Sequence, residues 1–473
     1  MTVTTNAPAI DGVLGHIEAH LDETIEKLKQ FSRIPGVSAD PPPNPALKES
    51  AEFVRAWMTE IGLENAEILE IEGVHPYVYA DWLHAEGAPT LLLYAHHDVQ
   101  PPGRPDHWKS PAFEPTERDG RLYGRGVVDD KAGAAIHFAA LEAYIKQGGL
   151  PVNIKVVIDG EEEIGSENLG AFLDRYRSRL DAEVIVLTDT ANLASGLPSI
   201  TYALRGIVIV DVEVAAIDHP LHSGIWGGPV PDAPLALCTM LGSLVDAEGR
   251  IAIDGLYDKV RPLDDTVRER LQGLPYDEAE FRQDAGFLDG VQMAGEQAIR
   301  SPYEKIWHRP AIAISALEVA PMKGASNQIV PSARARIGIR TVPDMNAAET
   351  AEALCKTLRE RAPWGVQVKT EVKAKADWWI TDPSGEAFEA AERALASGFG
   401  RDSVYIGCGG SIPFVEPFAK VLAGVPALLV GLEDPICNAH SENESLLLSD
   451  FRKAVVSVVY LYDELSRLGS SKS

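Results

Sequence analysis

Four apolar runs in this chain each lead to side chains that can bind metal ions. Three of them are short and aliphatic, and they are followed by His96-His97-Asp98, by Glu161-Glu162-Glu163 and by Asp189. The fourth, residues 425–431, precedes a polar loop that carries His440. Imidazoles and carboxylates together form the usual ligand sets of catalytic zinc and related divalent ions. Their recurrence after four apolar runs predicts a metal-dependent hydrolase.

Each of these runs has the length and aliphatic composition of a strand buried in a parallel sheet. In open α/β sheets, ligands bind at the carboxyl ends of such strands, so we expect the polar ends to meet on one rim. Apolar residues recur at helical spacing around the strands, over residues 11–31, 48–61 and 131–146. Strands that alternate with helices in this way predict an α/β fold with a sheet built from βαβ units.

The length of the chain and a change of pattern in its middle predict two domains. The 473 residues exceed what one hydrophobic core usually serves. The middle of the chain changes to alternating strands, such as residues 334–341, with a long helical segment between them. The first pattern then returns and ends in a helix over residues 450–468. We therefore predict that residues 1–205 and 377–473 form one α/β domain, which an α+β domain at 206–376 interrupts.

Net charge and cysteine usage exclude several classes of protein. Lys and Arg number 43 against 70 Asp and Glu, and the formal charge of -27 repels nucleic-acid backbones and anionic membranes. The four cysteines are far apart, without a Cys-x-x-Cys pair, which favours reduced thiols over a redox centre. The start of the chain lacks a signal-peptide pattern, and no apolar stretch reaches the roughly 18 residues of a membrane span. We expect a cytoplasmic protein that binds neither nucleic acid nor membranes.

Each polar group also has an ordinary structural interpretation. His96 and Asp98 are two residues apart, so in a strand they share a face and Asp98 can orient the imidazole, whereas His97 points away. The pair Asp129-Asp130 precedes a predicted helix, where an aspartate commonly caps the first turn. The acids at 161–163 form either a solvated face or a site in which one acid binds metal and its neighbour acts as a general base.

Together, four segments resemble the signatures of a known family. They are AHHDVQP (95–101), YGRGVVDDK (123–131), DGEEEIGS (159–166) and AHS (439–441). In order and spacing they are similar to the dinuclear metallopeptidase family of carnosinase, cytosolic non-specific dipeptidase, carboxypeptidase G and acetylornithine deacetylase. Within the family, four segments resemble the dipeptidase branch: DVQP (98–101), ITYALRG (200–206), LHSG (221–224) and GGSIP (409–413). The resemblance implies a zinc-peptidase-like, mostly parallel sheet flanked by helices and interrupted by a lid and dimerisation domain.

The resemblance also implies two divalent metal ions per subunit, zinc with manganese or cobalt as alternatives. Their implied ligands are His96 and Asp189 for one ion, Glu163 and His440 for the other, and Asp129 as the bridge. Glu162 would be the general base that activates a water bridging the two metals, and Asp98 would orient His96. Two metal ions about 3.5 to 4 Å apart polarise a carbonyl and activate a shared water. A cis peptide bond is expected between Asp129 and Asp130.

Substrate-binding residues are implied in the middle domain and in the GGSIP segment. Arg340 would grip the terminal carboxylate of the substrate with its forked guanidinium, together with Gly410 and Ser411. His222 would reach into the site of a partner subunit and stabilise the tetrahedral intermediate, which makes the enzyme a homodimer. Gln328 stands where a threonine is common and would also contact substrate. Without the resemblance, Arg340 is an ordinary strand arginine and His222 a loop histidine.

These features predict a metal-dependent dipeptidase that hydrolyses dipeptides or short peptides with a free C-terminus. An N-acyl-amino-acid deacylase, of the acetylornithine deacetylase or succinyl-diaminopimelate desuccinylase type, uses the same metals and base. It stays open as an alternative, because no residue identifies recognition of a free amino terminus. A non-catalytic dimeric binder would be expected to lack a ligand or Glu162, and all these positions are filled. Gly407-Cys408 replace the Arg-Glu pair usual in carnosinase-like members, so the preferred substrate side chains stay open too.

Overall fold

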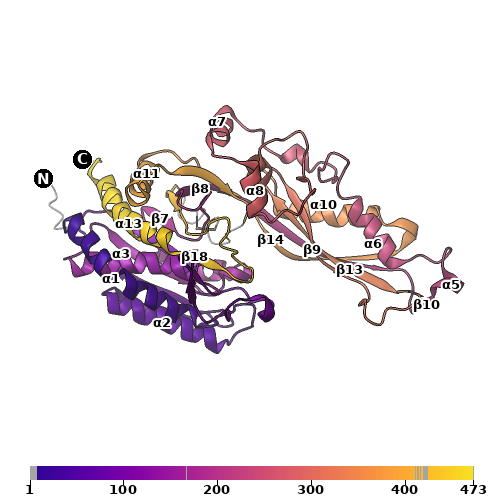
Figure 1. Ribbon diagram of the computed structural model, residues 1–473, viewed down its shortest axis with the longest axis horizontal. Helices are drawn as coiled ribbons and strands as arrows, with labels where there is room; N and C mark the ends of the chain where they lie inside the picture. The colour runs from indigo at the N-terminus through magenta and orange to yellow at the C-terminus, as the bar shows by residue number, and fades with distance from the viewer. Residues whose placement is uncertain are drawn as a thin grey trace.

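The chain folds into two lobes that lie side by side along its long axis (Figure 1). The computed structural model describes residues 8–166, 168–410, 412, 415, 417–418 and 424–471. The first lobe contains the elements from α1 (Ile10–Ser32) to β8 (Ser199–Leu204) and from β15 (Trp379–Ile380) to α13 (Leu448–Leu465). The second lobe contains the elements from β9 (Gly206–Ala215) to β14 (Gln367–Ala376).

A nine-stranded sheet forms the centre of the first lobe. Its strands are ordered β1 (Glu64–Leu69), β2 (Tyr77–Trp82), β6 (Asn153–Asp159), β3 (Thr90–His96), β7 (Val184–Leu187), β17 (Ala427–Leu429), β8 and β15, and β16 (Val404–Cys408) also pairs with β8. Neighbouring strands from β6 to β17 run parallel, whereas β1, β2 and β15 are antiparallel to their neighbours. The predicted α/β sheet, parallel at its centre and flanked by helices, is confirmed.

Apolar side chains cover both faces of this sheet, because its central strands are buried on both sides. Leu91 and Leu93 point to a core shared with α1, α2 (Pro45–Ile61), α3 (Lys131–Lys146), α11 (Glu386–Phe399) and α13. Leu92 and Tyr94 point to the opposite face, where α4 (Leu169–Tyr176) packs. Burial of each large apolar side chain stabilises the fold by about 1.5 to 3 kcal/mol. This free energy favours the orientation of β3 in which its side chains enter the two cores. Since these directions alternate, His96 at the end of β3 points to the face of Tyr94.

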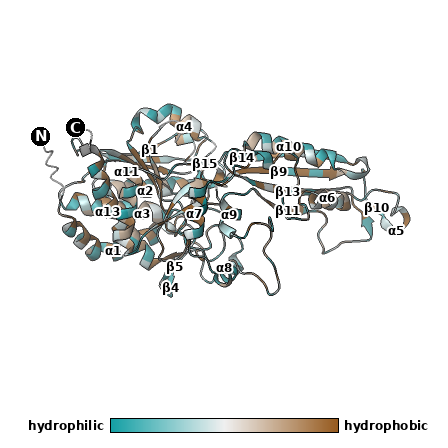
Figure 2. Ribbon diagram, turned by 90° about the horizontal axis from the view of Figure 1, so that it is seen from above, coloured by the Kyte–Doolittle hydropathy of each residue, from teal (hydrophilic) through white to brown (hydrophobic). Residues whose placement is uncertain are grey.

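An antiparallel sheet and two helices build the core of the second lobe. Strands β11 (Ala311–Glu318), β13 (Ser332–Thr341), β9 and β14 pair in this order. Buried and exposed positions alternate along β9 and β13, as their sequences predict. The apolar face packs on α6 (Ala233–Gly242) and α10 (Ala347–Glu360), and Figure 2 shows hydrophobic residues along β9 beside α10.

The segment between β9 and β11 differs from the predicted long helical segment. It holds the short helices α5 (Ser223–Trp226), α6, α7 (Asp265–Gly273), α8 (Glu278–Asp284) and α9 (Pro302–Trp307). Pro234 and Pro302 lie in the first turns of α6 and α9, where proline is tolerated, and Pro262 and Pro275 flank α7. Proline does not continue a helix from a preceding turn, so these prolines divide the segment.

Two smaller sheets complete the described fold. At the far end of the second lobe, β10 (Leu221–His222) pairs with β12 (Gln328–Ile329). In the first lobe, β18 (Ser445–Leu447), β5 (Arg121–Tyr123) and β4 (Thr116–Arg118) form a three-stranded sheet. The chain leaves the large sheet between β8 and β9 and returns to it between β14 and β15. That residues 206–376 fold as an independent domain stays a prediction. Within the described ranges, no helix combines the length and the apolar character that a membrane span requires.

Candidate metal centre

The parallel strands bring the predicted polar ends to one rim of the large sheet. In the register of β3 and β6, His96 stands opposite Asp159, so the chain that leaves β6 runs past the imidazole. β7 pairs in parallel with β3, and Asp189 follows the end of β7 by two residues. β17 lies on the other side of β7, and the loop that leaves it carries His440. The predicted convergence is therefore present.

Two groups of side chains on this rim have ligand atoms close enough to share a metal ion. They are His96, Asp129 and Asp189, and Asp129, Glu163 and His440, and the atoms in each group lie within 4.8 Å of one another. His96 Nε2 lies 3.0 Å from Asp129 Oδ1 and 3.7 Å from Asp189 Oδ1. His440 Nε2 lies 2.9 Å from Asp129 Oδ2 and 3.2 Å from Glu163 Oε2. Asp129 thus offers one carboxylate oxygen to each group.

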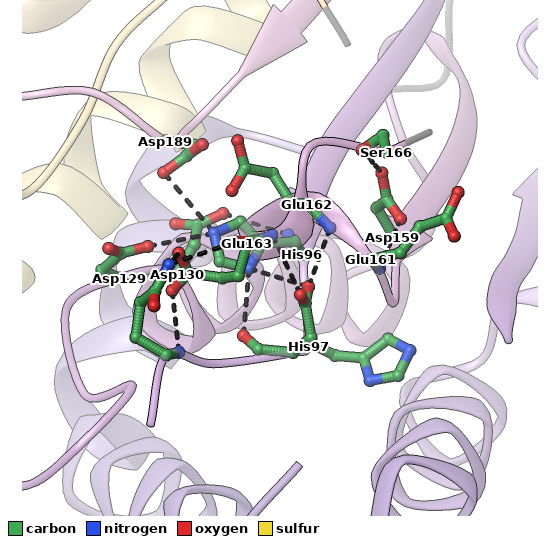
Figure 3. Close-up of polar contacts among 12 residues, drawn as sticks. His96, His97, Asp129, Asp130, Asp159, Glu161, Glu162, Glu163, Ser166 and Asp189 are labelled. Atoms are coloured by element: carbon green, nitrogen blue, oxygen red, sulfur yellow. Dashed lines mark hydrogen bonds and ion pairs between the residues drawn. The ribbon is translucent and has the colours of Figure 1, made fainter. Parts of the chain in front are cut away.

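Asp98 fixes both the imidazole of His96 and the turn that follows β6. Its Oδ1 atom lies 3.3 Å from His96 Nδ1, which leaves Nε2 to face the first ligand group. The same carboxylate accepts hydrogen bonds from the backbone N–H groups of Glu162 at 3.2 Å and Glu163 at 3.0 Å. His97 is turned away from these groups, as predicted, and its ring contacts α2 (Figure 3).

Asp130 does not act as the helix cap that its position suggested. Its side chain makes no capping hydrogen bond at the start of α3. One of its carboxylate oxygens accepts a hydrogen bond from the backbone N–H of His96 at 3.2 Å, and the other has no hydrogen-bond partner in the described part of the chain. The peptide bond between Asp129 and Asp130 is cis, as the resemblance implied. Asp129 therefore belongs to the ligand groups, and the carboxylate of Asp130 contacts the backbone of His96, one of the ligands.

The three acids that follow β6 have different environments, which excludes a solvated face. Glu161 is 1% exposed, and its carboxylate accepts a hydrogen bond of 2.8 Å from the Tyr77 hydroxyl. Glu163 belongs to the second ligand group and accepts a hydrogen bond of 2.8 Å from Gln100 Nε2. Glu162 belongs to neither group, although it lies between these two acids (Figure 3). Glu161 is thus structural, and Glu162 is the acid left without a ligand position.

Two buried ion pairs hold the loop that carries His440. Asp434, which precedes His440, accepts hydrogen bonds of 2.8 and 2.6 Å from the guanidinium of Arg121. Glu444, which follows it, accepts a hydrogen bond of 2.6 Å from Arg125 Nη1. Arg125 lies in the segment of the bridging aspartate, so the second pair joins two segments that supply ligand atoms.

Carboxylates outnumber cationic groups on the rim, and this imbalance shifts their pKa values. Burial, followed by the charge of Asp189, raises the pKa of Glu162 above its ordinary value. Burial and the charge of Asp129 raise the pKa of Glu163 to about 7. Hydrogen bonds to Asp129 and Glu163 raise the pKa of His440 to about 11. Such a site favours bound cations, and its mixed imidazole and carboxylate donors fit divalent zinc, manganese or cobalt.

Comparison with known proteins identifies the family. The sequence model of the peptidase family M20/M25/M40 matches residues 92–464, a range that contains both ligand groups. The chain belongs to this family. It is therefore a hydrolase that acts on peptide bonds, as the sequence predicted.

Similar M20 proteins match this chain over most of its length. A cysteinylglycine-S-conjugate dipeptidase of Corynebacterium striatum is 35% identical over 401 residues, which are 84% of this chain and 86% of that protein. The structure of the di-peptidase Dug1p from Saccharomyces cerevisiae has a TM-score of 0.87 at 25% identity and covers 98% of this chain and 99% of its own. Human carnosine dipeptidase 1 has a TM-score of 0.85 at 26% identity, with coverage of 98% and 100%. The likeness therefore includes both lobes.

Arg340 and Gly410, which the M20 resemblance assigns to the substrate carboxylate, both interact with the thiol of Cys408. Arg340 is half-buried in β13, where burial lowers its pKa and Cys408 is close enough to act on it. Cys408 Sγ accepts a hydrogen bond of 3.3 Å from the Gly410 N–H. The same thiol interacts with the charge of Asp189. Ser411, the third predicted member, lies outside the described residues.

The structure does not bring His222 and Gln328 to the metal groups of the same chain. The two residues pair across β10 and β12 at the far end of the second lobe, and both are exposed (Figure 1). His222 Nδ1 accepts a hydrogen bond of 3.0 Å from the Gly224 N–H. A role for either residue at a metal centre therefore requires a second subunit.

Several residues around the centre were missed by reasoning from the sequence. Glu433 is half-buried in the loop after β17, where burial and the charges of Asp129 and Asp189 raise its pKa. Its signal was present, since it is a polar residue close behind a buried strand, like the predicted ligands. The pairing of Arg125 with Glu444 joins positions 319 residues apart, and nothing in the sequence indicates it.

Proposed function

We propose that this M20 peptidase is a metal-dependent dipeptidase that hydrolyses dipeptides or short peptides with a free C-terminus. The observation that carries the proposal is the pair of ligand groups that share Asp129, with the carboxyl of Glu162 beside them and outside both. The dipeptidase names of the similar proteins support the substrate class.

The ligand groups assign a place to each of two divalent ions. One ion would be held by His96 and Asp189, the other by Glu163 and His440, and both by Asp129. When bound, such ions polarise the scissile carbonyl and lower the pKa of water. Asp98 supports the site by facing Nδ1 of His96, because Nε2 is then left as the nitrogen that would bind a cation. Zinc, manganese and cobalt all suit these donors.

Glu162 is the general base of the proposed reaction. Its backbone N–H donates to Asp98, which holds the residue on the rim while its carboxyl stays out of both ligand groups. Burial and the charge of Asp189 raise its pKa. A carboxyl of raised pKa can take a proton from the attacking water and then give it to the leaving amine.

Arg340 holds the terminal carboxylate of the substrate, together with Gly410 and Ser411. A guanidinium can donate two parallel hydrogen bonds to one carboxylate, which fixes both its position and its orientation. The hydrogen bond from Gly410 to Cys408 and the electrostatic interaction of Arg340 with Cys408 support this assignment, because they indicate that the three residues lie near one another.

The enzyme is proposed to be a homodimer in which His222 of the partner subunit completes each site, with Gln328 of the partner subunit beside the substrate. The exposed position of the pair at the tip of the second lobe supports this arrangement. Ile225 and Trp226 follow in α5 and are 73% and 49% exposed. Exposed apolar side chains that lie together mark contact surfaces. A cytoplasmic location is supported by the four free cysteines.

A substrate panel tests the dipeptidase proposal. Dipeptides would be compared with N-acetyl and N-succinyl amino acids, using zinc-loaded wild type, a chelated sample and Glu162→Gln. We expect metal-dependent cleavage of dipeptides and a loss of about 10²- to 10⁴-fold in kcat for Glu162→Gln, with unchanged metal content. Cleavage confined to acylated substrates would replace the proposal with the deacylase alternative, and no cleavage of any substrate would contradict both.

Mixing two inactive variants tests the dimer. If His222 acts across the interface, the hybrid of Glu162→Gln and His222→Ala chains has one site with both groups intact. Equal mixing after subunit exchange should then restore about one quarter of wild-type activity, because half of the dimers are hybrids and half of their sites work. The Glu162→Gln and His222→Ala chains, each exchanged with wild type, serve as controls for assembly. No recovery from chains shown to form hybrids would place His222 outside the partner's site.

A further inference from the structure

One acid near the metal centre has neither a ligand position nor a cationic partner. Glu433 lies in the loop after β17, and its backbone forms a bridge with Ala191. Its carbonyl oxygen accepts a hydrogen bond of 2.7 Å from the Asn192 N–H. These backbone contacts place Glu433 beside the segment that leaves β7 with Asp189, on the metal-binding rim of the sheet.

The carboxyl of Glu433 lies near the centre and outside the ligand groups. Its carboxyl is close enough to Asp129, Asp189 and His440 for their charges to act on it. It is absent from both groups of ligand atoms. No lysine, arginine or histidine of the described residues lies within ion-pair distance of it.

Two other acids of the same loop differ from Glu433, because each has a cationic partner. Asp434, the next residue, is paired with Arg121, and Glu444 is paired with Arg125. A carboxylate withdrawn from water is costly unless a cation or hydrogen-bond donors compensate it. Both structural acids of the loop meet that requirement within the chain, whereas Glu433 leaves room for a cation that comes from outside.

We propose that Glu433 binds the α-ammonium group of the substrate, so that the centre selects peptides with a free amino terminus. This inference rests on the proposed peptidase function and names the recognition of one end of its substrate. An ammonium group donates three hydrogen bonds, and its positive charge would compensate the negative charge of the carboxylate.

The position of Glu433 relative to Arg340 agrees with a short zwitterionic substrate. Cys408 interacts with the charge of Glu433, and Arg340 interacts with Cys408. An acidic group and a basic group are thus both near Cys408, and a dipeptide carries the complementary charges at its two ends. An N-acyl substrate would leave Glu433 uncompensated, and sites built around a polar contact discriminate strongly against analogues that lack it.

A matched pair of substrates tests this role. Alanylalanine and N-propionylalanine differ by the ammonium group alone, and the ratio of their kcat/KM values measures recognition of that group. In zinc-loaded Glu433→Gln we expect this ratio to fall about 10- to 100-fold, because a charge-assisted hydrogen bond is replaced by a neutral contact. The control is Glu442→Gln, an acid of the same loop that pairs with exposed Arg104, and its ratio should equal that of wild type.

The possible results separate this inference from the proposed function. An unchanged ratio in Glu433→Gln, or equal losses on both substrates with fewer metal ions bound, would overturn the ammonium site. If wild type cleaves N-propionylalanine and not alanylalanine, the dipeptidase proposal fails. The binding of alanylalanine, measured by calorimetry, then tests whether Glu433 binds an ammonium group. In that assay, zinc-loaded Glu162→Gln should bind alanylalanine, and adding Glu433→Gln should weaken the binding about 10-fold or more. Equal affinities would overturn the inference.

Discussion

The buried pair of Arg125 and Glu444 gives a sharp prediction about how the metal centre is supported. Glu444→Gln removes one charge with little change of shape. Val128 N–H donates to the Glu444 carboxylate at 3.1 Å, and a glutamine oxygen can still accept that hydrogen bond. The guanidinium of Arg125, however, would face a neutral amide at the position of a contact now 2.6 Å long. The substitution therefore tests the charge pair and spares the backbone contact.

The expected magnitude follows from the burial of both partners. The side chains of Arg125 and Glu444 are 1% and 0% exposed, so water does not replace the lost partner. Removal of one member of such a pair costs about 3 to 5 kcal/mol in the free energy of unfolding. The pair also joins the loop of His440 to the segment of Asp129. Zinc affinity at the second ligand group should therefore fall about 10- to 100-fold, as for other residues that orient metal ligands.

Denaturant unfolding of the chelated protein and zinc titration against a competing chelator measure the two effects. Glu442→Gln is the control on the same loop, because its partner Arg104 is exposed and the expected loss is at most about 1 kcal/mol. Replacing both members, as Arg125→Met with Glu444→Leu, should restore stability relative to either single variant. A loss below about 1 kcal/mol in Glu444→Gln would refute the assignment of the pair as the support of the loop.

Three further substitutions test other parts of the structure. Asp98→Ala should weaken zinc binding about 10- to 100-fold, since His96 loses the group that orients it, and a chelator competition with unchanged affinity would contradict this. Arg340→Lys should reduce the preference for free over amidated dipeptides about 10-fold, measured as a ratio of kcat/KM values. Burial lowers the pKa of His137 to about 3, so between pH 6.5 and 3 the unfolded chain binds a proton that the folded chain does not. Stability is thus lost as pH falls, by about 2 kcal/mol from pH 6.5 to 5. His137→Gln should remove that part of the pH dependence of denaturant unfolding, and an unaltered dependence would contradict the assignment.

The elements that place the metal ligands could be predicted from the sequence because their patterns are local. A strand with two buried faces reads as a continuous aliphatic run, and the run before His96 ends where β3 ends. The helical spacing of α3 gave its bounds, Lys131–Lys146, without error. Alternation along a strand also predicted that His97 points away from His96. Each of these properties depends on residues within a few positions of one another.

Other features depend on residues that meet only in the folded chain. The pairs of Arg121 with Asp434 and Arg125 with Glu444 join positions 313 and 319 residues apart, and in the sequence alone each arginine resembles a surface charge. The sequence predicts a long helical segment before β11, whereas the chain forms short helices there that prolines divide. His222 lies outside any site of its own chain, so a single chain does not test the role that its motif implies.

The acids of the loop around His440 show how a structural carboxylate differs from one available for binding. Asp434 and Glu444 are as buried as a catalytic acid would be, and by sequence they are no less plausible as site residues. Each has a guanidinium within 2.6 Å, so its charge is already compensated inside the fold. Glu433 lies next to Asp434 and near the metal groups, but the described chain supplies it with no such partner. Whether a carboxylate has an ion-pair partner inside the fold, more than its burial or its place in a motif, therefore indicates its role. A paired carboxylate stabilises the protein, and an unpaired one is available to bind a substrate.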